Sequence, residues 1–351
     1  MTTRRLANSA LKADADESGG GFDLVARIGN TPIRPIRFLV EGKSRCVHLK
    51  LEGENPGGSI KDRTALSLLR SLERTGRLST SGRLVESSSG NLAVALAMLA
   101  RESGYRFTAV LDPKVTAENM YRLQELGAET AMVEVRDETG GYLLTRLARV
   151  RELLADDPGL LWTNQYTNAA NPEAHYLSTA PEIFRQMEER VDAVFVAVST
   201  GGTLAGIGRY FREASPDTRI IAVDTRGSIA LGGSPGLRNL NGMGSSRRSE
   251  FVGAGLYDEL AYVGDCEAFA FCRALDDAIG IKVGGSSGAC LAACARYLQL
   301  HGEVERVVCV CADRGEHYAS SIFSDSWLDR NGLDTGRHHL GSVSKICLWR
   351  R

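Results

Sequence analysis

Apolar residues follow two different patterns along this chain, and the two patterns alternate. Short stretches such as 193–198 are apolar at every position, as expected for strands buried on both faces of a parallel sheet. Between them lie longer stretches with apolar residues three or four positions apart, such as Leu66, Leu69 and Leu72, which predict amphipathic helices. This regular alternation predicts an α/β fold with mainly parallel sheets.

The predicted elements extend over most of the chain. Strands are expected at 45–51, 84–85, 107–111, 130–135, 193–198, 219–223 and 306–311. Helices are expected at 61–75, 92–100, 116–126, 141–154, 174–189, 202–213, 267–279 and 287–300. A glycine-rich stretch at 227–255 has neither pattern and predicts irregular structure. Two sets of βαβ units with a cleft between them fit this order better than a single sheet.

Composition and charge argue against several classes of function for this protein. The 351 residues are 43% hydrophobic and 24% charged, which is ordinary for a globular protein. A net charge of −1 gives no electrostatic reason to bind nucleic acid or an anionic membrane. No apolar run approaches the roughly 18 residues of a membrane-spanning helix. Residues 1–21 lack the apolar core of a signal peptide, so we predict a disordered leader on a cytoplasmic protein.

The cysteines and histidines do not predict a metal site. None of the eight cysteines forms a CxxC pair, and no histidine lies at ligand spacing from them. Small buried thiols in a reducing compartment account for them better. The pair His338 and His339 lies in a polar tail and is predicted to be inert.

Three loops that follow predicted strands are rich in glycine and small polar residues, at 87–91, 199–203 and 284–288. Ligands of open α/β sheets bind at these carboxyl ends of strands. The second loop consists of Ser199, Thr200, Gly201, Gly202 and Thr203. Its glycines, hydroxyls and following helix N-terminus suit a phosphate group. It is neither a Walker loop nor a dinucleotide-binding turn, and taken alone it is also compatible with a structural turn.

The stretch 55–63 turns sharply at a proline and two glycines and then enters a helix. Ser59 and Asp62 have the spacing of a capping box, which places Lys61 in the first helical turn. A cation there opposes the helix dipole at a cost of roughly 0.3–1 kcal/mol. Lys61 is therefore either a solvated surface lysine or an amine directed into a cleft to form a Schiff base with a carbonyl cofactor. The stretch alone does not decide between them.

With the segments 28–32 and 164–166, these motifs resemble the cysteine synthase and cystathionine β-synthase family of fold-type II pyridoxal-phosphate enzymes. The resemblance covers residues 28–316. It implies the architecture of tryptophan synthase β, with two parallel-sheet domains, the active site in the cleft between them, and a homodimer. The implied parts are a large cofactor-binding domain at 22–54 and 166–330, a smaller mobile domain at 55–165, and a C-terminal tail at 331–351.

The resemblance also assigns the cofactor site. Lys61 would hold pyridoxal phosphate as a Schiff base and, once released, remove the proton from the substrate Cα. The loop 199–203 would bind the phosphate, Asn91 the ring hydroxyl and Ser286 the pyridine nitrogen. A serine at that nitrogen favours rapid loss of a β-leaving group. The expected product of that loss is an aminoacrylate intermediate, which a nucleophile then attacks at Cβ.

On the substrate side, Ser88, Ser89 and Asn91 would bind the amino-acid carboxylate, with Gln165 facing them. Three residues depart from the sulfide-using members of the family. Ser199 stands where those members usually have glycine, and Tyr166 where they usually have phenylalanine. Arg238 lies where many acetylserine-using members have histidine, and an arginine suits a departing phosphate.

Together these departures resemble the synthases of 2,3-diaminopropionate biosynthesis, which supply siderophore and antibiotic pathways. Those enzymes join O-phospho-L-serine and L-glutamate into N-(2-amino-2-carboxyethyl)-L-glutamate and release phosphate. Arg146, Arg247 and Arg248 are candidate contacts for the carboxylates of glutamate, although each also fits a solvated surface. Two alternatives stay open. One is a cysteine synthase that uses sulfide, and the other is a cofactor-free scaffold or regulatory protein with an inherited cleft.

Overall fold

The larger of two β-sheets in the computed structural model has seven strands in the order β11-β1-β2-β10-β7-β8-β9. The structure describes residues 22–138 and 140–349, so the predicted disordered leader lies outside the described residues. Neighbouring strands from β2 to β9 run parallel, whereas β1 is antiparallel to both β2 and β11. The strands are β1 (Ile33–Val40), β2 (Lys43–Leu51), β7 (Ala193–Ala197), β8 (Arg219–Thr225), β9 (Glu259–Val263), β10 (Val307–Cys311) and β11 (Val343–Leu348).

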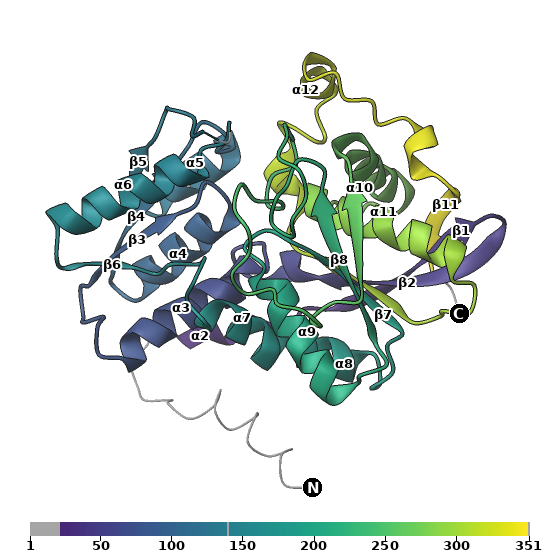
Figure 1. Cartoon of the computed structure of the whole chain (residues 1–351), viewed down its shortest axis with the longest axis horizontal. Coiled ribbons are helices and arrows are strands. Elements are labelled where there is room, and N and C mark those ends of the chain that lie inside the picture. The colour runs from purple at the N-terminus through teal and green to yellow at the C-terminus, as the bar shows by residue number, and fades with distance from the viewer. Residues whose placement is uncertain (1–21, 139, 350–351) are drawn as a thin grey trace, which may run out of the picture.

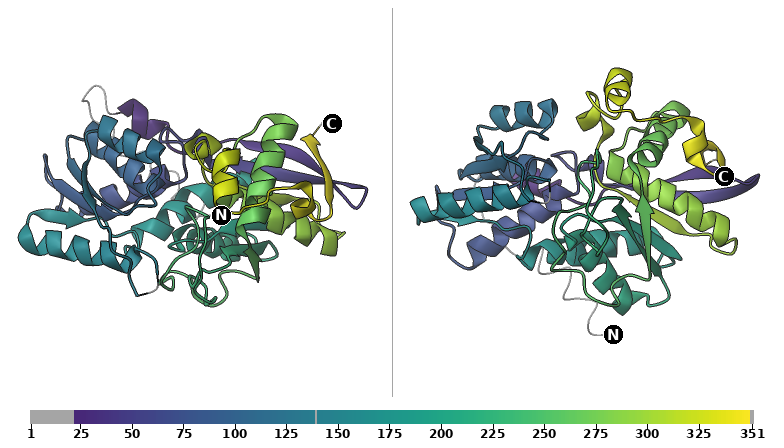
Figure 2. Two further views of the ribbon diagram at one scale, coloured as in Figure 1. Left: turned by 90° about the horizontal axis from the view of Figure 1, so that it is seen from above. Right: turned by 45° about the horizontal axis from the view of Figure 1, so that its top comes forward.

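The smaller sheet lies beside the larger one (Figure 1) and has four parallel strands in the order β5-β4-β3-β6. Its strands are β3 (Arg83–Ser87), β4 (Arg106–Leu111), β5 (Glu129–Met132) and β6 (Leu160–Trp162). The two sheets stay separate in all views (Figure 2). The predicted α/β class with mainly parallel sheets is confirmed.

Helices cover both sheets. The α-helices are α2 (Phe22–Ala26), α3 (Lys61–Arg74), α4 (Asn91–Glu102), α5 (Ala117–Glu125), α6 (Leu143–Asp156), α7 (Ala170–Ala174), α8 (Ala180–Gln186), α9 (Gly202–Ala214), α10 (Asp265–Ile279), α11 (Gly285–Leu300) and α12 (Asp325–Arg330). The short turns are η1 (Glu52–Glu54), η2 (His175–Thr179), η3 (Gly315–Tyr318) and η4 (Arg337–Leu340). The single helix predicted at 174–189 is interrupted, because η2 is a π-helical turn between α7 and α8. No helix in the described part of the chain is long and apolar enough to cross a membrane.

Strand alternation explains how the larger sheet is packed. In β7, Ala193 and Phe195 belong to a core cluster shared with α10 and α11, whereas Val194 and Val196 belong to a second cluster shared with α8 and α9. Successive side chains of a strand point to opposite faces, so a fully apolar strand requires cover on both. Phe195 packs edge-on against Tyr297 of α11, with ring centroids 5.5 Å apart. The continuous apolar run therefore reflects a sheet buried between two helical layers.

Four strands, β1, β6, β9 and β11, were not predicted. The sequence indicated only a tail at 331–351, yet β11 lies within it and pairs antiparallel with β1, from Ile36 opposite Leu348 to Val40 opposite Val343. Val343 is 4% exposed, so this strand closes part of the core. The edge strand β11 and its neighbour β1 carry exposed charges that hide their alternation, and β6 has only three residues.

A buried ionic network holds the beginning of α3 in place. Arg63 donates hydrogen bonds to Glu52 (Nε to Oε2, 2.7 Å) and to Glu182 (Nη2 to Oε2, 2.7 Å). Lys50 Nζ donates to the same Glu182 oxygen at 2.9 Å. The two cationic side chains are at most 2% exposed, and two carboxylates balance them. These contacts join the end of β2, α3 and α8 into one unit.

The segment before β1 joins the same network. The Thr31 hydroxyl donates to Glu52 Oε1 at 2.6 Å, and the backbone N–H of Asn30 donates to Glu182 Oε1 at 2.9 Å. Asn55 donates from its side chain to Glu52 Oε2 at 2.9 Å. The network therefore fixes the entrance of the turn that leads to Lys61.

Replacing Arg63 should destabilise the protein strongly. Arg63→Met leaves the Glu52 and Glu182 carboxylates buried with less compensation, and we expect the free energy of unfolding to fall by about 3–5 kcal/mol. Arg209→Met is the control, because it breaks the exposed Arg209–Glu173 pair, which should cost below about 1 kcal/mol. Urea unfolding of both variants measures the difference. Equal, small losses would contradict the structural role of the network.

Candidate active site

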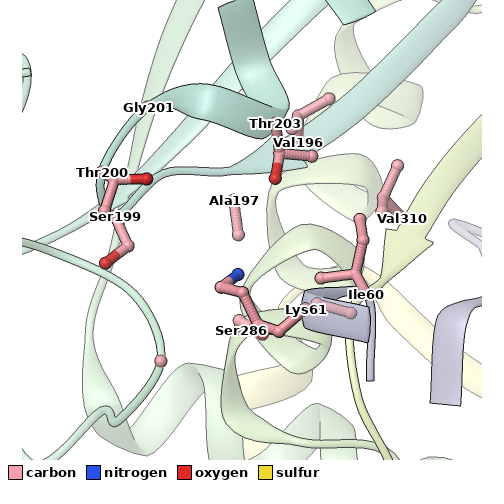
Figure 3. Close-up of a pocket in the computed structure, with 12 residues that line it drawn as sticks. Ile60, Lys61, Val196, Ala197, Ser199, Thr200, Gly201, Thr203, Ser286 and Val310 are labelled. Atoms are coloured by element: carbon pink, nitrogen blue, oxygen red, sulfur yellow. The ribbon is translucent and has the colours of Figure 1, made fainter. Parts of the chain in front are cut away.

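Lys61 opens α3 and its amine points into a pocket (Figure 3). The pocket is also lined by Ser199, Thr200, Gly201 and Thr203 from the loop after β7, and by Ser286 from the start of α11. The structure therefore brings together three segments that are more than 80 residues apart in the sequence. The interpretation of Lys61 as a solvated surface lysine is wrong.

The turn before Lys61 is held differently from the prediction. No side chain caps α3, so the predicted capping box is not formed. The Asp62 carboxylate instead accepts a hydrogen bond from the backbone N–H of Gly57 at 2.5 Å, and Ser59 Oγ accepts one from the N–H of Lys61 at 3.2 Å. A Cβ at Gly57 would lie 2.4 Å from Asp62 Oδ1, so the turn requires glycine there. The N–H of Ile60 donates to the carbonyl of Ala312, which ties the turn to the end of β10.

The environment of Lys61 favours its neutral form. Burial lowers the pKa of the Lys61 amine, and the negative charge of Asp313 opposes this shift. A neutral amine is a nucleophile that can condense with a carbonyl group and a base that can accept a proton. The sequence could not give this property, because it follows from the elements that surround the side chain.

The loop between β7 and α9 has the shape of an anion cradle. Gly201 has φ +92°, and a Cβ on it would lie 2.0 Å from Ser249 Oγ. A Cβ on Gly202 would lie 2.1 Å from Asn171 Oδ1, so both positions require glycine. The 13-residue helix α9 begins at Gly202 and directs its free N–H groups toward the loop. With the hydroxyls of Thr200 and Thr203, this donor set fits a phosphate group.

Two polar residues that the sequence did not indicate support this loop. The imidazole Nε2 of His175 lies 3.2 Å from Thr203 Oγ1 and 3.1 Å from Thr64 Oγ1. Burial holds the pKa of His175 well below its usual range, and the charges of Lys61 and Arg63 lower it further, so the ring is neutral. Asn171 donates from Nδ2 to Thr200 Oγ1 at 3.1 Å and to the carbonyl of Gln165 at 2.7 Å. Neither residue belongs to a recognisable motif, and only their buried contacts identify them.

The predicted substrate residues form a second group outside the lining of the Lys61 pocket. The Ser89 hydroxyl accepts a hydrogen bond from the N–H of Asp112 at 2.9 Å. Gln165 donates from Nε2 to the carbonyl of Ser87 at 2.9 Å, and the Tyr166 hydroxyl donates to the same carbonyl at 3.2 Å. The segment with Gln165 and Tyr166 is therefore docked against the 87–91 loop.

The loop that contains Ser88 and Ser89 is itself fixed by a buried acid. Glu86 is fully buried at the end of β3, where its Oε2 accepts hydrogen bonds from Thr163 Oγ1 at 2.6 Å and from the N–H of Gln165 at 3.0 Å. Ser88 is buried as well. Asn91, the first residue of α4, donates instead to Asp313, which connects this group to Lys61.

The candidate arginines occupy different places. Arg146 lies 3.1 Å from Asp112 and is close to Ser89, and its side chain is 13% exposed, so it is not a solvated surface residue. The Arg247 guanidinium lies 5.6 Å from the ring centroid of Tyr166. Arg248 lines a separate cavity with Ser249 and Tyr257.

Arg238 lies near the loop 199–203 but outside the Lys61 pocket. Its Nη1 donates to the carbonyl of Gly227 at 2.9 Å. A Cβ on Gly244 would lie 2.9 Å from Arg238 Nε, and the Gly244 carbonyl accepts a hydrogen bond from Ser199 Oγ at 3.4 Å. Gly244 therefore lies between Arg238 and Ser199 in space, and Arg238 does not line the Lys61 pocket.

One group in the described part of the chain has the residue types of a metal site. Asp334, His338 and His339 place their ligand atoms within 4.8 Å of one another. His338 Nε2 lies 3.0 Å from Asp334 Oδ2, so the histidine pair has an acidic partner that the sequence prediction did not consider. The group lies around η4 in the C-terminal tail, and none of its residues lines the Lys61 pocket.

Residues 25–313 match the sequence family described as pyridoxal-phosphate dependent enzyme. The chain belongs to this family. It is therefore a pyridoxal-phosphate-dependent enzyme, and the predicted cofactor is confirmed. The glycine cradle, the α9 N-terminus and the low-pKa amine of Lys61 all fit this group.

Two curated relatives are named for a more specific activity than the family is. The chain is 42% identical over 307 residues to the N-(2-amino-2-carboxyethyl)-L-glutamate synthase of Ralstonia nicotianae, which covers 88% of this chain and 91% of that protein. It is 40% identical over 310 residues to the enzyme of the same name from Cupriavidus metallidurans, with 88% and 91% covered.

Solved structures share the fold. A hydrogen sulfide-producing enzyme from Fusobacterium nucleatum superimposes with a TM-score of 0.79 at 29% identity, covering 86% of this chain and all of that one. The O-acetylserine-dependent cystathionine β-synthase of Helicobacter pylori has a TM-score of 0.78 at 29% identity, covering 85% and 97%. The predicted fold-type II architecture is confirmed.

Borohydride should trap the cofactor on Lys61. We expect reduction of the cofactor-loaded protein to leave a stable adduct on the peptide that contains Lys61, and Lys61→Ala to abolish it. Lys282→Ala is the matched control, because Lys282 is an exposed lysine beside Asp276 and should leave trapping unchanged. Peptide mass spectrometry measures the adduct. The same yield from Lys61→Ala would refute the assignment.

Asp62 should make stability fall as pH rises. Burial raises the pKa of Asp62 from 3.8 to about 7, so the folded state favours the protonated carboxyl. The corresponding stability is fully present below about pH 4 and is lost as pH approaches 7. We therefore expect wild type to lose stability relative to Asp62→Asn between pH 5 and pH 8, measured as the difference in urea midpoints. A difference that does not change with pH would contradict the burial of this acid.

Proposed function

We propose that this enzyme joins O-phospho-L-serine and L-glutamate into N-(2-amino-2-carboxyethyl)-L-glutamate, in 2,3-diaminopropionate biosynthesis. The bond from Cβ to the phosphate oxygen breaks, and a bond from Cβ to the glutamate nitrogen forms. Phosphate leaves, and the amine proton is released. The observation that carries the proposal is the 40–42% identity, over 88% of the chain, to two curated enzymes of that name.

The residues around Lys61 suit the first half of this reaction. When bound, pyridoxal phosphate withdraws electrons from the substrate Cα, so that its proton can be removed and the β-substituent can leave. The loop 199–203 would hold its phosphate and Ser286, which is 4% exposed, its ring nitrogen. Lys61 would anchor the cofactor and take the Cα proton, because burial lowers the pKa of its amine and so favours the neutral form. The apolar side chains of Ile60, Val196 and Val310 line the same pocket and limit the entry of water.

Arg238 suits the leaving phosphate. Burial lowers the pKa of its guanidinium, yet an arginine remains charged at neutral pH. No ion pair engages Arg238 within the described residues, and only its bond to Gly227 is present there, which leaves other N–H groups for an anion. Arg238 lies beside Gly244, which accepts a hydrogen bond from Ser199, so its charge is near the loop proposed to hold the cofactor phosphate.

The surroundings of Tyr166 suit the second substrate. Arg247 lies over the Tyr166 ring, and burial raises the pKa of the Tyr166 hydroxyl while the charges of Arg146 and Arg247 oppose this shift. Arg146 is paired with Asp112 and Arg247 with Glu250, and each guanidinium has further N–H groups that would donate to the two carboxylates of glutamate. Sulfide has no carboxylate, so a sulfide-using enzyme would not need these arginines to bind its second substrate.

We also propose that the enzyme acts in the cytoplasm as a homodimer with a mobile smaller domain. All eight cysteines are free, which suits a reducing compartment. The homodimer and the mobility rest on resemblance to the family. Light scattering of the purified protein tests the first, and limited proteolysis with and without phosphoserine tests the second.

A competition assay tests the proposed reaction. The cofactor-loaded enzyme receives phosphoserine with either glutamate or sulfide, and mass spectrometry follows the products. We expect N-(2-amino-2-carboxyethyl)-L-glutamate to form faster than cysteine. Faster formation of cysteine would overturn the proposal in favour of a cysteine synthase. A colourless protein that forms neither product would support the scaffold alternative.

Arg238 should discriminate between leaving groups. We expect Arg238→Gln to lower kcat/KM for phosphoserine about 10–100-fold, since a hydrogen bond to a charged group contributes roughly 1.5–3 kcal/mol. With O-acetylserine, which has no phosphate, the change should stay below about 3-fold. Arg226→Gln is the matched control, because Arg226 is exposed and precedes the same irregular stretch. Equal losses with both substrates would remove Arg238 from phosphate recognition.

A further inference from the structure

Asp313 is a buried acid at the junction of the two sheets, and the sequence assigned no role to it. It lies two residues beyond β10 and is 3% exposed. Its Oδ2 accepts hydrogen bonds from Asn91 Nδ2 at 2.6 Å and from the Tyr318 hydroxyl at 2.5 Å. Its Oδ1 is buried without a hydrogen-bond partner among the described residues and lies against Gly284, where a Cβ would be 2.1 Å away. A buried acid with one unpaired oxygen is costly to keep, so a role beyond packing is expected.

The contacts of Asp313 connect the two sheets. Asn91 begins the helix that follows β3 of the smaller sheet, whereas Asp313 and Tyr318 follow β10 of the larger one. Asp313 also forms a β-bridge with Ser59, two residues before Lys61. The carboxylate thus contacts the residue expected to meet the cofactor ring and borders the turn that carries the cofactor lysine.

An ionised carboxylate determines which way the Asn91 amide faces. A carboxylate only accepts hydrogen bonds, so Asn91 must turn its NH2 group toward Asp313 and its oxygen away. An uncharged amide at position 313 could donate as well as accept, and both orientations of Asn91 would then become available. The group that Asn91 offers to a ligand therefore depends on the charge of Asp313.

The same carboxylate acts on Lys61. Among the charged groups around the Lys61 amine, Asp313 is the one that raises its pKa. His175, on the other side, is neutral, and Arg63 is already paired with Glu52 and Glu182. Burial raises the pKa of the Asp313 carboxyl, but the hydrogen bonds from Tyr318 and Asn91 and the charge of Lys61 favour its ionised form. In that form Asp313 is the negative charge that offsets part of the effect of burial on the Lys61 amine.

We propose that Asp313 is a positioning residue of the active site, which orients the Asn91 amide and holds a negative charge beside the Lys61 amine. This role depends on the cofactor that the family uses and not on the identity of the two substrates. If the enzyme did not use glutamate, the proposed role of Asp313 would therefore be unaffected. A purely structural buried acid would affect stability but neither of the two properties measured below.

The first experiment measures the charge effect in cofactor-free protein. An amine-reactive acetylating reagent modifies neutral lysines, and peptide mass spectrometry follows the rate at Lys61 from pH 6 to pH 10. We expect Asp313→Asn to lower the apparent pKa of Lys61 by about one unit, because a nearby opposite charge is removed. Asp224→Asn is the matched control, since Asp224 is also fully buried in the larger sheet and should leave Lys61 unchanged. An unchanged Lys61 profile in Asp313→Asn would overturn the charge role.

The second experiment isolates the orientation of Asn91 with pyridoxine 5′-phosphate, which has the ring hydroxyl but no aldehyde to react with Lys61. Its dissociation constant is measured for wild type, Asn91→Ala, Asp313→Asn and the double variant. We expect the single variant Asp313→Asn to bind pyridoxine 5′-phosphate about 5–10-fold more weakly than wild type. The double variant should bind it as weakly as Asn91→Ala alone, because Asp313 acts through Asn91. Independent, multiplying losses would overturn the orienting role. If Asp313→Asn cannot be purified folded, Asp313→Ser, which also removes the charge, takes its place in both experiments.

Discussion

The site depends on one constraint, the buried network of Lys50, Glu52, Arg63 and Glu182. Each charge in it is shielded from water and is tolerable only because an opposite charge and hydrogen bonds surround it. Arg63 lies two residues after Lys61, so the requirement to satisfy its guanidinium fixes the direction in which α3 begins. The segment before β1 and the end of β2 have no freedom to move without exposing one of these charges.

Burial then determines the chemistry of the groups nearest the pocket. The same lack of solvent lowers the pKa of Lys61, keeps His175 neutral beneath the phosphate-like loop, and raises the pKa of Asp313. The loop 199–203 contains no cation, so hydroxyl groups, backbone N–H groups and the α9 N-terminus form the anion cradle. Because hydroxyl and backbone N–H groups form the cradle, burial is the main cause that lowers the pKa of the Lys61 amine, and Asp313 is the charge that opposes it.

Part of the fold could be predicted from sequence. The apolar runs of β7 and β10 and the periodic helices α3, α9 and α11 were identified, because each depends on contacts that repeat locally along one element. The edge strand β11 and its neighbour β1 were not, since their pairing joins residues about three hundred positions apart and their exposed faces are polar. The capping box failed for a similar reason. Its spacing was correct, but the Asp62 carboxylate found a partner in the Gly57 turn.

The sequence by itself determined that the chain alternates strands and helices, and that Lys61 and the loop 199–203 are its chemically distinctive parts. Of the three polar loops expected after strands, those at 87–91 and 199–203 follow β3 and β7, whereas the one at 284–288 follows helix α10 and forms the start of α11. Glycines and hydroxyls carry this information locally, because the backbone shapes they permit are encoded within a few residues. Only the tertiary structure decided what surrounds them. Asp313, Asn171 and His175 act through burial and through hydrogen bonds to distant elements, and neither property exists until the two sheets are folded beside each other.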